Sequence, residues 1–403
     1  MKKTFLLIII LLFFLIPEGI AQYGFRKGFV IASEKDTIYG ELDYRSNLSN
    51  NKSCLFRKGS VVTEYKPSQI LGYGFTGGRY FTSQIIKGTF VEVLVKGELS
   101  LFKSGFDLYV QKINNEPLRL ESKIIRETVE TKVEGERNES VVYREDVRWK
   151  GLLSALTSDC IESSNAIQVL KLDEKNLTRF VIDYNLCKGS GYTDYKSKLP
   201  WTKFEYGITA GLAVSSIKTK NKPYNFEYLD DIYQSVNPTF GVQLVVSSPR
   251  IYEKIVLETG LYYIKSSFHS QVVKEKTGEM AYYDTYINFS SLSLPISLRY
   301  IFPGRNYTLF LSGGLDIAYI LNSDSKLLSE IQSGNTVDSY ESDAFTINKV
   351  APGLSGEIGV IRSLQHFRIG TTLRYYSSNR YNTERTYDSN LGRISLSIII
   401  SGK

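Results

Sequence analysis

Apolar and polar side chains alternate along eight segments in the second half of the chain. The clearest segment runs from Ser291 to Tyr300, where leucine or isoleucine occupies four of the even positions and serine, proline and arginine occupy the odd ones. The segments cover residues 205–214, 239–246, 257–263, 291–300, 309–319, 354–360, 367–375 and 393–400. A period of two is typical of a β-strand whose two faces meet different surroundings. The pattern therefore predicts an all-β, eight-stranded antiparallel barrel over residues 201–403.

Two environments could produce this alternation, because a soluble β-sandwich or lipocalin-like barrel also alternates. The segments are about ten residues long, which suits a tilted crossing of a bilayer better than the usual strand of about five or six. Charged residues also occupy the row between the apolar ones, where a membrane barrel has its polar interior. These candidate interior charges are Glu258, Arg299, Asp316, Glu357, Arg368 and Arg374. We therefore favour a transmembrane barrel.

The connections between the segments differ in length, which predicts an orientation. Those after the first, third, fifth and seventh segments are long and polar, whereas 302–306 and 363–366 are short. Outer-membrane barrels have long loops outside the cell and short turns in the periplasm. The region before the barrel, residues 22–200, is then expected in the periplasm. Tyr206, Tyr263, Tyr300, Tyr319 and Tyr375 lie near segment ends, as in interfacial aromatic girdles.

The first 21 residues have the features of a secretory signal peptide. Lys2 and Lys3 precede an apolar run from Phe5 to Ile16, and small residues near Ala21 suit a signal peptidase. The run is too short for a membrane-spanning helix, which needs roughly 20 apolar residues. No cysteine follows it to carry a lipoprotein anchor.

Residues 22–200 mix strand and helix patterns and are expected to form a mostly β, α+β domain. Strands are predicted at 29–31, 37–44, 53–56 and 88–95. Two short helices are predicted near the end of this domain, at 148–155 and 174–184.

The three cysteines of the chain all lie in this N-terminal region. Cys160 and Cys187 each lie next to a predicted helix end, and export favours oxidation, so they are the candidate disulfide. The alternative is two independent buried thiols. Cys54 is then the odd cysteine, expected as a buried strand residue.

The segment from Gly72 to Gly77 fits the letters of the dinucleotide fingerprint GxGxxG. That fingerprint requires a helix at its end to hold the pyrophosphate, whereas another strand pattern follows Gly78 here. We interpret the segment as a tight β-turn.

The amino-acid composition argues against several classes of function. The 403 residues include three Cys and two His, which makes a His/Cys metal site improbable, and no cofactor is expected. The formal charge of +7 is spread without a basic block, so a nucleic-acid partner is not expected. His269 and His366 are predicted at opposite rims of the barrel, so they cannot share a hydrolytic site. Glu258 and Glu357 could form an acid/base pair, but Arg299 and Arg374 favour salt-bridged filling.

The segment from Leu292 to Tyr300, of sequence LSLPISLRY, resembles a strand of the PorT-like outer-membrane β-barrel family. Leu257–Tyr263 resembles the preceding strand of that family, and Ser312-Gly313-Gly314 resembles its Gly-Gly strand. The resemblance covers about residues 203–403 and implies residence in the outer membrane, with some members linked to protein secretion and no shared enzymatic reaction. The chain departs from the family at Ser293, where glutamate is common, and in lacking a terminal aromatic residue that the barrel-insertion machinery recognises.

These observations favour a non-catalytic binding or assembly protein of the outer membrane. The expected partners are outer-membrane lipid, the barrel-insertion machinery and envelope or periplasmic proteins. An eight-stranded barrel has an interior that its own side chains can fill, which disfavours a wide pore. A narrow transporter or gated channel for small solutes is the alternative function, and a soluble secreted β-protein is the alternative fold.

Overall fold

The computed structural model describes residues 24–44, 47–133, 136–220, 226–276, 278–304, 307–344, 346–379, 381–383 and 387–402. The expected signal peptide, residues 1–21, lies outside these described residues. The chain divides into two compact units, the first ending at Leu199 and the second beginning at Pro200.

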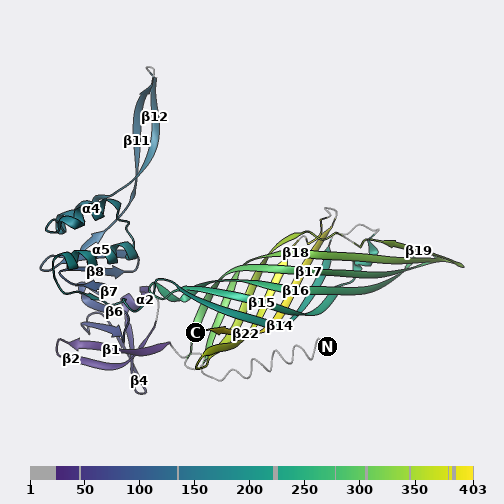
Figure 1. Cartoon of the computed structure of the whole chain (residues 1–403), viewed down its shortest axis with the longest axis horizontal. Helices are drawn as coiled ribbons and strands as arrows, with labels where there is room; N and C mark the ends of the chain where they lie inside the picture. Colours follow the sequence, from purple (N-terminus) through teal and green to yellow (C-terminus); the bar gives the residue numbers. More distant parts are fainter. Residues whose placement is uncertain are drawn as a thin grey trace. The chain divides into compact units, whose positions relative to one another are not determined.

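The first unit is built on one antiparallel sheet with the strand order β10-β9-β8-β7-β6-β5-β1-β2-β3-β4, to which the short strand β13 is added at β7 (Figure 1). The four strands predicted from the sequence overlap β1, β2, β3 and β7 to within one residue. The bounds are β1 (Phe25–Ser33), β2 (Asp36–Asp43), β3 (Cys54–Lys58), β4 (Val61–Tyr65), β5 (Gly72–Phe75), β6 (Tyr80–Ile86), β7 (Thr89–Lys96), β8 (Leu99–Ser104), β9 (Asp107–Lys112), β10 (Leu118–Leu120) and β13 (Thr193–Asp194).

A separate two-stranded hairpin, β11 (Ile124–Val133) and β12 (Glu136–Glu145), stands away from the main sheet of this unit in Figure 1. The segment that resembled a nucleotide fingerprint is the hairpin of β5 and β6. Gly77 lies in its turn with φ of 70°, a conformation that glycine adopts without strain.

Three helices follow the hairpin, where the sequence pattern predicted two: α3 (Arg148–Leu156), α4 (Ile161–Val169) and α5 (Glu174–Cys187). A further short helix, α2 (Asn47–Lys52), lies between β2 and β3. The missed helix α4 buries little more than Ser163 and Ile167, while Ile161 and Val169 are exposed. Since α4 has no continuous apolar stripe, hydrophobic periodicity could not reveal it.

Helix α5, unlike α4, has a continuous apolar stripe. It begins at an Asp173 cap, whose carboxylate accepts a hydrogen bond from the Asn176 N–H at 2.8 Å. Leu177, Phe180, Val181 and Tyr184 form its buried stripe and pack in one core with β7 and β8 residues such as Leu94 and Leu101. The helices thus cover the sheet through α5.

The second unit is a ring of eight long antiparallel strands (Figure 1). The strands pair in the order β14-β15-β16-β17-β18-β20-β21-β22, and β22 pairs with β14, so each strand of the ring has two neighbours. The bounds are β14 (Lys203–Lys220), β15 (Tyr233–Ser248), β16 (Tyr252–Lys276), β17 (Glu279–Pro303), β18 (Tyr307–Ser333), β19 (Thr336–Ser342), β20 (Val350–Ser363), β21 (Phe367–Ser378) and β22 (Asp388–Gly402), with a short 3₁₀ helix η1 (Glu227–Asp230).

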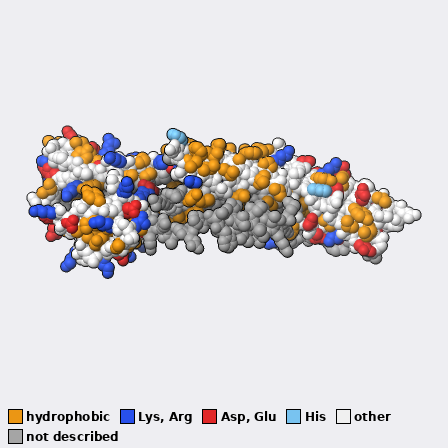
Figure 2. Space-filling model, turned by 90° about the horizontal axis from the view of Figure 1, so that it is seen from below, with side chains coloured by type: hydrophobic (Ala, Val, Ile, Leu, Met, Phe, Trp, Pro, Cys, Tyr) orange, Lys and Arg blue, Asp and Glu red, His pale blue; other side chains and the backbone are white. Residues whose placement is uncertain are grey.

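The side chains of this ring are arranged apolar outside and polar inside. In β17, Leu294, Ile296 and Leu298 are 42–64% exposed, while Ser293, Ser297 and Arg299 are each 4% exposed. Figure 2 shows hydrophobic side chains gathered over the outer wall. A soluble barrel would bury the apolar row, so this arrangement is the one expected for a wall that contacts lipid.

Three strands continue far beyond the predicted ten-residue segments: β16 and β17 have 25 residues each and β18 has 27. The sequence pattern treated these continuations as long loops, which is wrong. Their alternation changes phase, because the inward row becomes apolar, with Phe268 and Ile287 buried, and the outward row becomes polar. This reversal of the apolar and polar rows is expected where a barrel wall passes from lipid into water. Because of it, the sequence pattern did not predict that the strands continue.

Candidate functional site

The interior of the ring holds an ion-pair network contributed by four strands. Arg299 Nε lies 2.8 Å from Glu258 Oε2, and Arg374 Nε lies 2.7 Å from Glu357 Oε2. Two longer ion pairs connect these two, with Arg374 Nη2 3.4 Å from Glu258 Oε1 and Arg299 Nη2 3.7 Å from Glu357 Oε1. The four charges cancel within one cluster, so neither carboxylate is available as a lone base or nucleophile.

Aromatic rings hold the two guanidinium groups in place. Arg299 lies over the ring of Phe310 at 3.6 Å from the centroid, and Arg374 lies over Tyr262 at 4.0 Å. Arg374 also donates a hydrogen bond to the Tyr262 hydroxyl at 3.0 Å, and the Gln243 amide donates to Glu258. These packed contacts fix the cluster across the lumen.

A second pair of interior charges lies further from the short connections between the strands. Asp316 accepts a hydrogen bond from Ser293, and Arg393 Nε donates to Ser215 Oγ at 3.1 Å. With the four charges above, these two make three carboxylates and three guanidinium groups. The cavity between them, lined by Asp316, Arg374 and Arg393 among others, has a volume of about 20 Å³. That space holds about one water molecule.

Arg368, also expected in the interior, does not join this network. Its guanidinium pairs with Glu205 at 2.6 Å and donates to the Gly402 carbonyl at 2.9 Å, so it belongs to the rim where β14 begins and β22 ends. Two inward-facing charges were missing from the sequence-predicted set, Arg393 in the lumen and Glu205 at the rim. The same period-two alternation places both on the inward row, so that signal could have found them.

The end of the lumen opposite the short connections is closed by a packed apolar core. Three connections fold inward over it and are tied there by hydrogen bonds: Tyr228 donates to the Ala344 carbonyl at 2.6 Å, and Asn382 donates to the Tyr387 carbonyl at 3.0 Å. The core contains Ile217, Tyr228, Leu229, Tyr233, Phe268, Ile287, Phe289, Ala318, Ile320, Leu327, Ala344, Ile347, Ala351, Tyr376, Tyr381, Tyr387 and Leu391. The lumen therefore has a charged, filled middle and an apolar, filled mouth.

The two histidines lie in different parts of the second unit. His269 is on the continuation of β16, stacks on Tyr286 at 4.5 Å and contacts the Asp284 carboxylate at 2.6 Å. His366 lies in the short turn between β20 and β21. Among the described residues, no three His, Cys, Asp or Glu side chains are grouped as metal ligands. No helix of the described part is long and apolar enough to cross a membrane.

The first unit contains a buried ion network of its own, centred on Lys196. Its ammonium is fully buried and lies 3.0 Å from Glu92 and 2.9 Å from Glu174. Arg79 pairs with Glu92 at 2.5 Å, and Lys103 pairs with Glu174 at 2.7 Å. Burial by itself raises the pKa of Glu92, but Arg79 and Lys196 outweigh it and lower the pKa to about 2.

This network fastens the end of the first unit to its sheet. β13 pairs with β7 at Val95 and Lys96, and the Tyr195 N–H donates to the Leu94 carbonyl at 3.2 Å. Residues 193–196 are thus part of the sheet, and only three residues separate Lys196 from Pro200, where the second unit begins.

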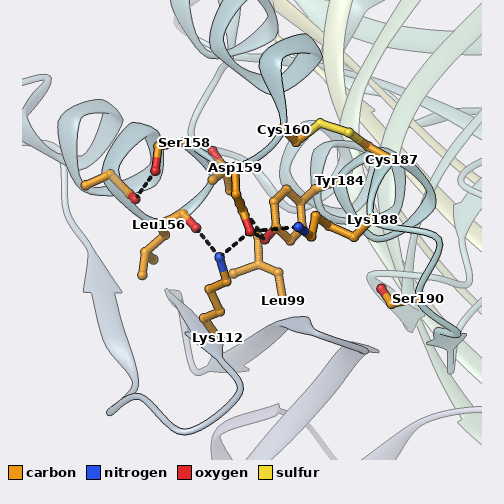
Figure 3. Close-up of polar contacts among 12 residues, drawn as sticks. Leu99, Lys112, Leu156, Ser158, Asp159, Cys160, Tyr184, Cys187, Lys188 and Ser190 are labelled. Atoms are coloured by element: carbon orange, nitrogen blue, oxygen red, sulfur yellow. Dashed lines mark hydrogen bonds and ion pairs between the residues drawn. A yellow bond between two sulfur atoms is a disulfide. The ribbon is translucent and has the colours of Figure 1, made fainter.

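Cys160 and Cys187, the expected disulfide pair, are joined by a disulfide in the structure (Figure 3). Cys54 is buried and lies outside this bridge. Beside the bridge, Asp159 accepts hydrogen bonds from Lys112 at 2.9 Å and from the Tyr184 hydroxyl at 2.9 Å, and Lys188 lies 3.1 Å away (Figure 3). The bond from Lys112, with those from Lys188 and Tyr184, holds the pKa of Asp159 well below its usual range.

The closed ring, its apolar outer wall and its charged interior define a membrane-type β-barrel. Residues 194–392 match the model of the family described as "Outer membrane protein beta-barrel domain". This match, over about half of the chain, indicates an outer-membrane β-barrel domain in the second unit and a location in the cell outer membrane. The match is to this broad family and does not single out the PorT-like group.

Solved structures of outer-membrane proteins align with about half of the chain. Neisserial surface protein A has 12% identity, covering 48% of this chain and 96% of its own, with a TM-score of 0.27. OprG from Pseudomonas aeruginosa has 13% identity, covering 49% and 95%, with a TM-score of 0.27. Ail, the attachment invasion locus protein of Yersinia pestis, has 11% identity, covering 49% and 97%, with a TM-score of 0.19. No curated protein matches the chain at a significant level.

Proposed function

We propose that this protein is a non-conducting outer-membrane barrel that anchors a folded periplasmic domain and binds partners without catalysis. The observation that carries the proposal is the filled lumen. Its middle is occupied by neutralised ion pairs around a cavity of about 20 Å³, and its mouth is packed with aromatic and aliphatic side chains. A hydrated ion or small solute needs a continuous wet path, which such filling does not offer.

The orientation in this proposal is supported by the lengths of the connections. Only three residues separate β15 from β16, β17 from β18 and β20 from β21, while the opposite end carries the strand continuations and the inward-folded connections. The chain enters the barrel at the short-turn end, because Lys203 of β14 pairs with Ser247 of β15 beside the first of these turns. Short turns are periplasmic in outer-membrane barrels, so the first unit is placed in the periplasm by this proposal.

A binding role is supported by how much of the chain is unnecessary for spanning a membrane. The first unit is a folded domain with a disulfide and a buried ion network, and it is attached through a segment of its own sheet. At the other end, β16, β17 and β18 continue beyond the lipid-facing wall and form an additional sheet with β19. Both parts offer surface to partners.

Planar-bilayer recording of the purified full-length protein tests the proposal. A filled lumen predicts no steady conductance steps, and an open porin added to the same membrane serves as the control for the assay. Reproducible single-channel steps from the protein alone would instead support the narrow transporter and overturn the closed lumen.

A further inference from the structure

The continuations of β16, β17 and β18, together with β19, form a four-stranded sheet that we call the outer sheet. It consists of residues 265–276, 279–290, 322–333 and 336–342. In Figure 1 these strands extend past the other strands of the ring to a tip. The face toward the barrel mouth is anchored by Phe268, Ile287, Phe289 and Leu327 in the apolar core. The sheet is therefore a fixed part of the fold.

Strand β19 forms one edge of the outer sheet. It pairs with β18 from Leu327↔Ser342 to Ser333↔Thr336, and within the described residues no strand pairs with its other side. All seven of its side chains are exposed. The two-residue turn at 334–335 makes Ser333 and Thr336 a hydrogen-bonded pair, so Val337, Ser339 and Glu341 direct their backbone groups away from β18. An exposed edge of this length is a template for a further strand.

The hairpin that carries this edge is acidic. Between Asn322 and Asp343 it has five carboxylates and a single cation, Lys326, in a chain whose overall formal charge is +7. The carboxylates are Asp324, Glu330, Asp338, Glu341 and Asp343. Lys326 pairs with Glu341 at 2.8 Å, whereas Glu330 and Asp338 have no ion pair within the part of the chain that the structure describes. This excess of negative charge attracts cationic segments and repels anionic ones.

We propose that the free edge of β19 binds an extended segment of a partner protein rich in lysine or arginine, which adds to the outer sheet as an antiparallel strand. Main-chain hydrogen bonds supply affinity in this mode, and the side chains supply selectivity. A second copy of this chain fits the edge less well, because pairing of two β19 strands would place two acidic hairpins side by side. The inference rests on the proposed function in one respect, that this edge faces the cell exterior.

Binding of short fluorescent peptides to the full-length protein in detergent tests the proposal. The probe is a heptapeptide in which lysine alternates with threonine or valine, and its acidic counterpart has glutamate at each lysine position. A third peptide keeps the lysines but carries a methyl group on every backbone nitrogen, so neither of its edges can pair as a strand. We expect the basic peptide to bind at least 10-fold more tightly than the acidic or the methylated one, with the difference shrinking at high salt.

Two variants locate the binding on β19. Ser339→Pro removes an outward N–H from the edge without breaking a bond to β18, and we expect it to weaken the basic peptide about 10-fold. Asp338→Asn combined with Glu341→Gln keeps the backbone and is expected to reduce the preference for the basic peptide. Heat-modifiable gel migration shows whether each variant barrel is folded.

Equal binding of the methylated peptide, equal binding of the acidic peptide, absence of binding, or dimerisation through β19 would each overturn the proposal. Because the assay is done in detergent, it does not depend on the orientation or conductance of the barrel. Failure here with a non-conducting barrel leaves the proposed function standing, while peptide binding by a conducting barrel overturns only the closed lumen.

Discussion

Replacing Lys196 with methionine removes the ammonium group that Glu92 and Glu174 share, while keeping a side chain of similar length. Both carboxylates are buried, and the lysine itself is fully buried. Removing one partner from a buried ion pair costs about 3–5 kcal/mol, because the remaining charge stays desolvated. Glu92 retains Arg79 and Glu174 retains Lys103, so we expect the lower end of this range. For a domain of this size, that corresponds to a loss of roughly 6–12 °C in Tm.

The buried Cys54 provides a reporter for this change that is specific to the first unit. It is 2% exposed and lies outside the disulfide, so a thiol reagent labels it only when the first unit opens. Its labelling is followed in the full-length protein against urea or temperature. Lys198→Met is the matched control, because Lys198 is an exposed lysine two residues away and its loss should change the stability by about 0.5 kcal/mol or less.

A double-mutant cycle with Glu174→Gln separates the ion pair from general disruption. Because the two side chains are in contact, the effects of the two substitutions should not add, and a coupling of about 1 kcal/mol or more is expected. If Lys196→Met shifts the midpoint no more than Lys198→Met does, the buried network does not fasten residues 193–196 to the domain, and the reasoning is refuted.

Three further predictions concern pH, the disulfide and the lumen. The pKa of Glu92 is lowered from an ordinary value of 4.5 to about 2. The ionised carboxylate therefore contributes ~3 kcal/mol to the stability of the first unit above about pH 4.5, and this contribution is lost as the pH falls through about 2. Glu92→Gln should flatten the acid limb of the curve of Cys54 labelling against pH. Denatured, unreduced protein should show one reactive thiol and reduced protein three, and three without reduction would contradict the Cys160–Cys187 bridge. Arg374→Met leaves Glu357 without its closest cation, so it should destabilise the barrel by about 3–5 kcal/mol and lower the temperature of the heat-induced gel shift. Substitution of the exposed Arg362 by methionine is the control and should leave that temperature unchanged. Equal midpoints for the two variants would count against the lumenal network.

The lipid-facing wall was predictable because one physical rule, lipid outside and charge inside, acts on every second residue. The rule placed Glu258, Arg299, Glu357 and Arg374 on one row, and the structure brings these four together. The rule applies only to the part of each strand that lies in the lipid-facing wall. Beyond Lys265 the outward side chains contact water, the phase of the alternation reverses, and the strands there looked like polar loops.

Other features left no local signal in the sequence. Helix α4 lacks an apolar stripe, so its periodicity is weak. Lys196 is an ordinary lysine in a polar stretch, and its burial depends on Glu92 and Glu174, which come from β7 and from the start of α5. Long-range contacts of this kind arise from packing and cannot be derived from residue spacing.

The central claim, that the apolar row of the barrel contacts lipid, can be measured directly with an environment-sensitive fluorophore. Single cysteines are introduced at Leu298 and Leu354, which are 64% and 65% exposed on the wall, and at Tyr340 on β19, which is 59% exposed, in a Cys54→Ser background. The labelled proteins are reconstituted in vesicles containing brominated lipids. The account predicts blue-shifted emission and strong quenching at positions 298 and 354, and water-like, unquenched emission at position 340. Water-like, unquenched emission at all three positions would contradict it.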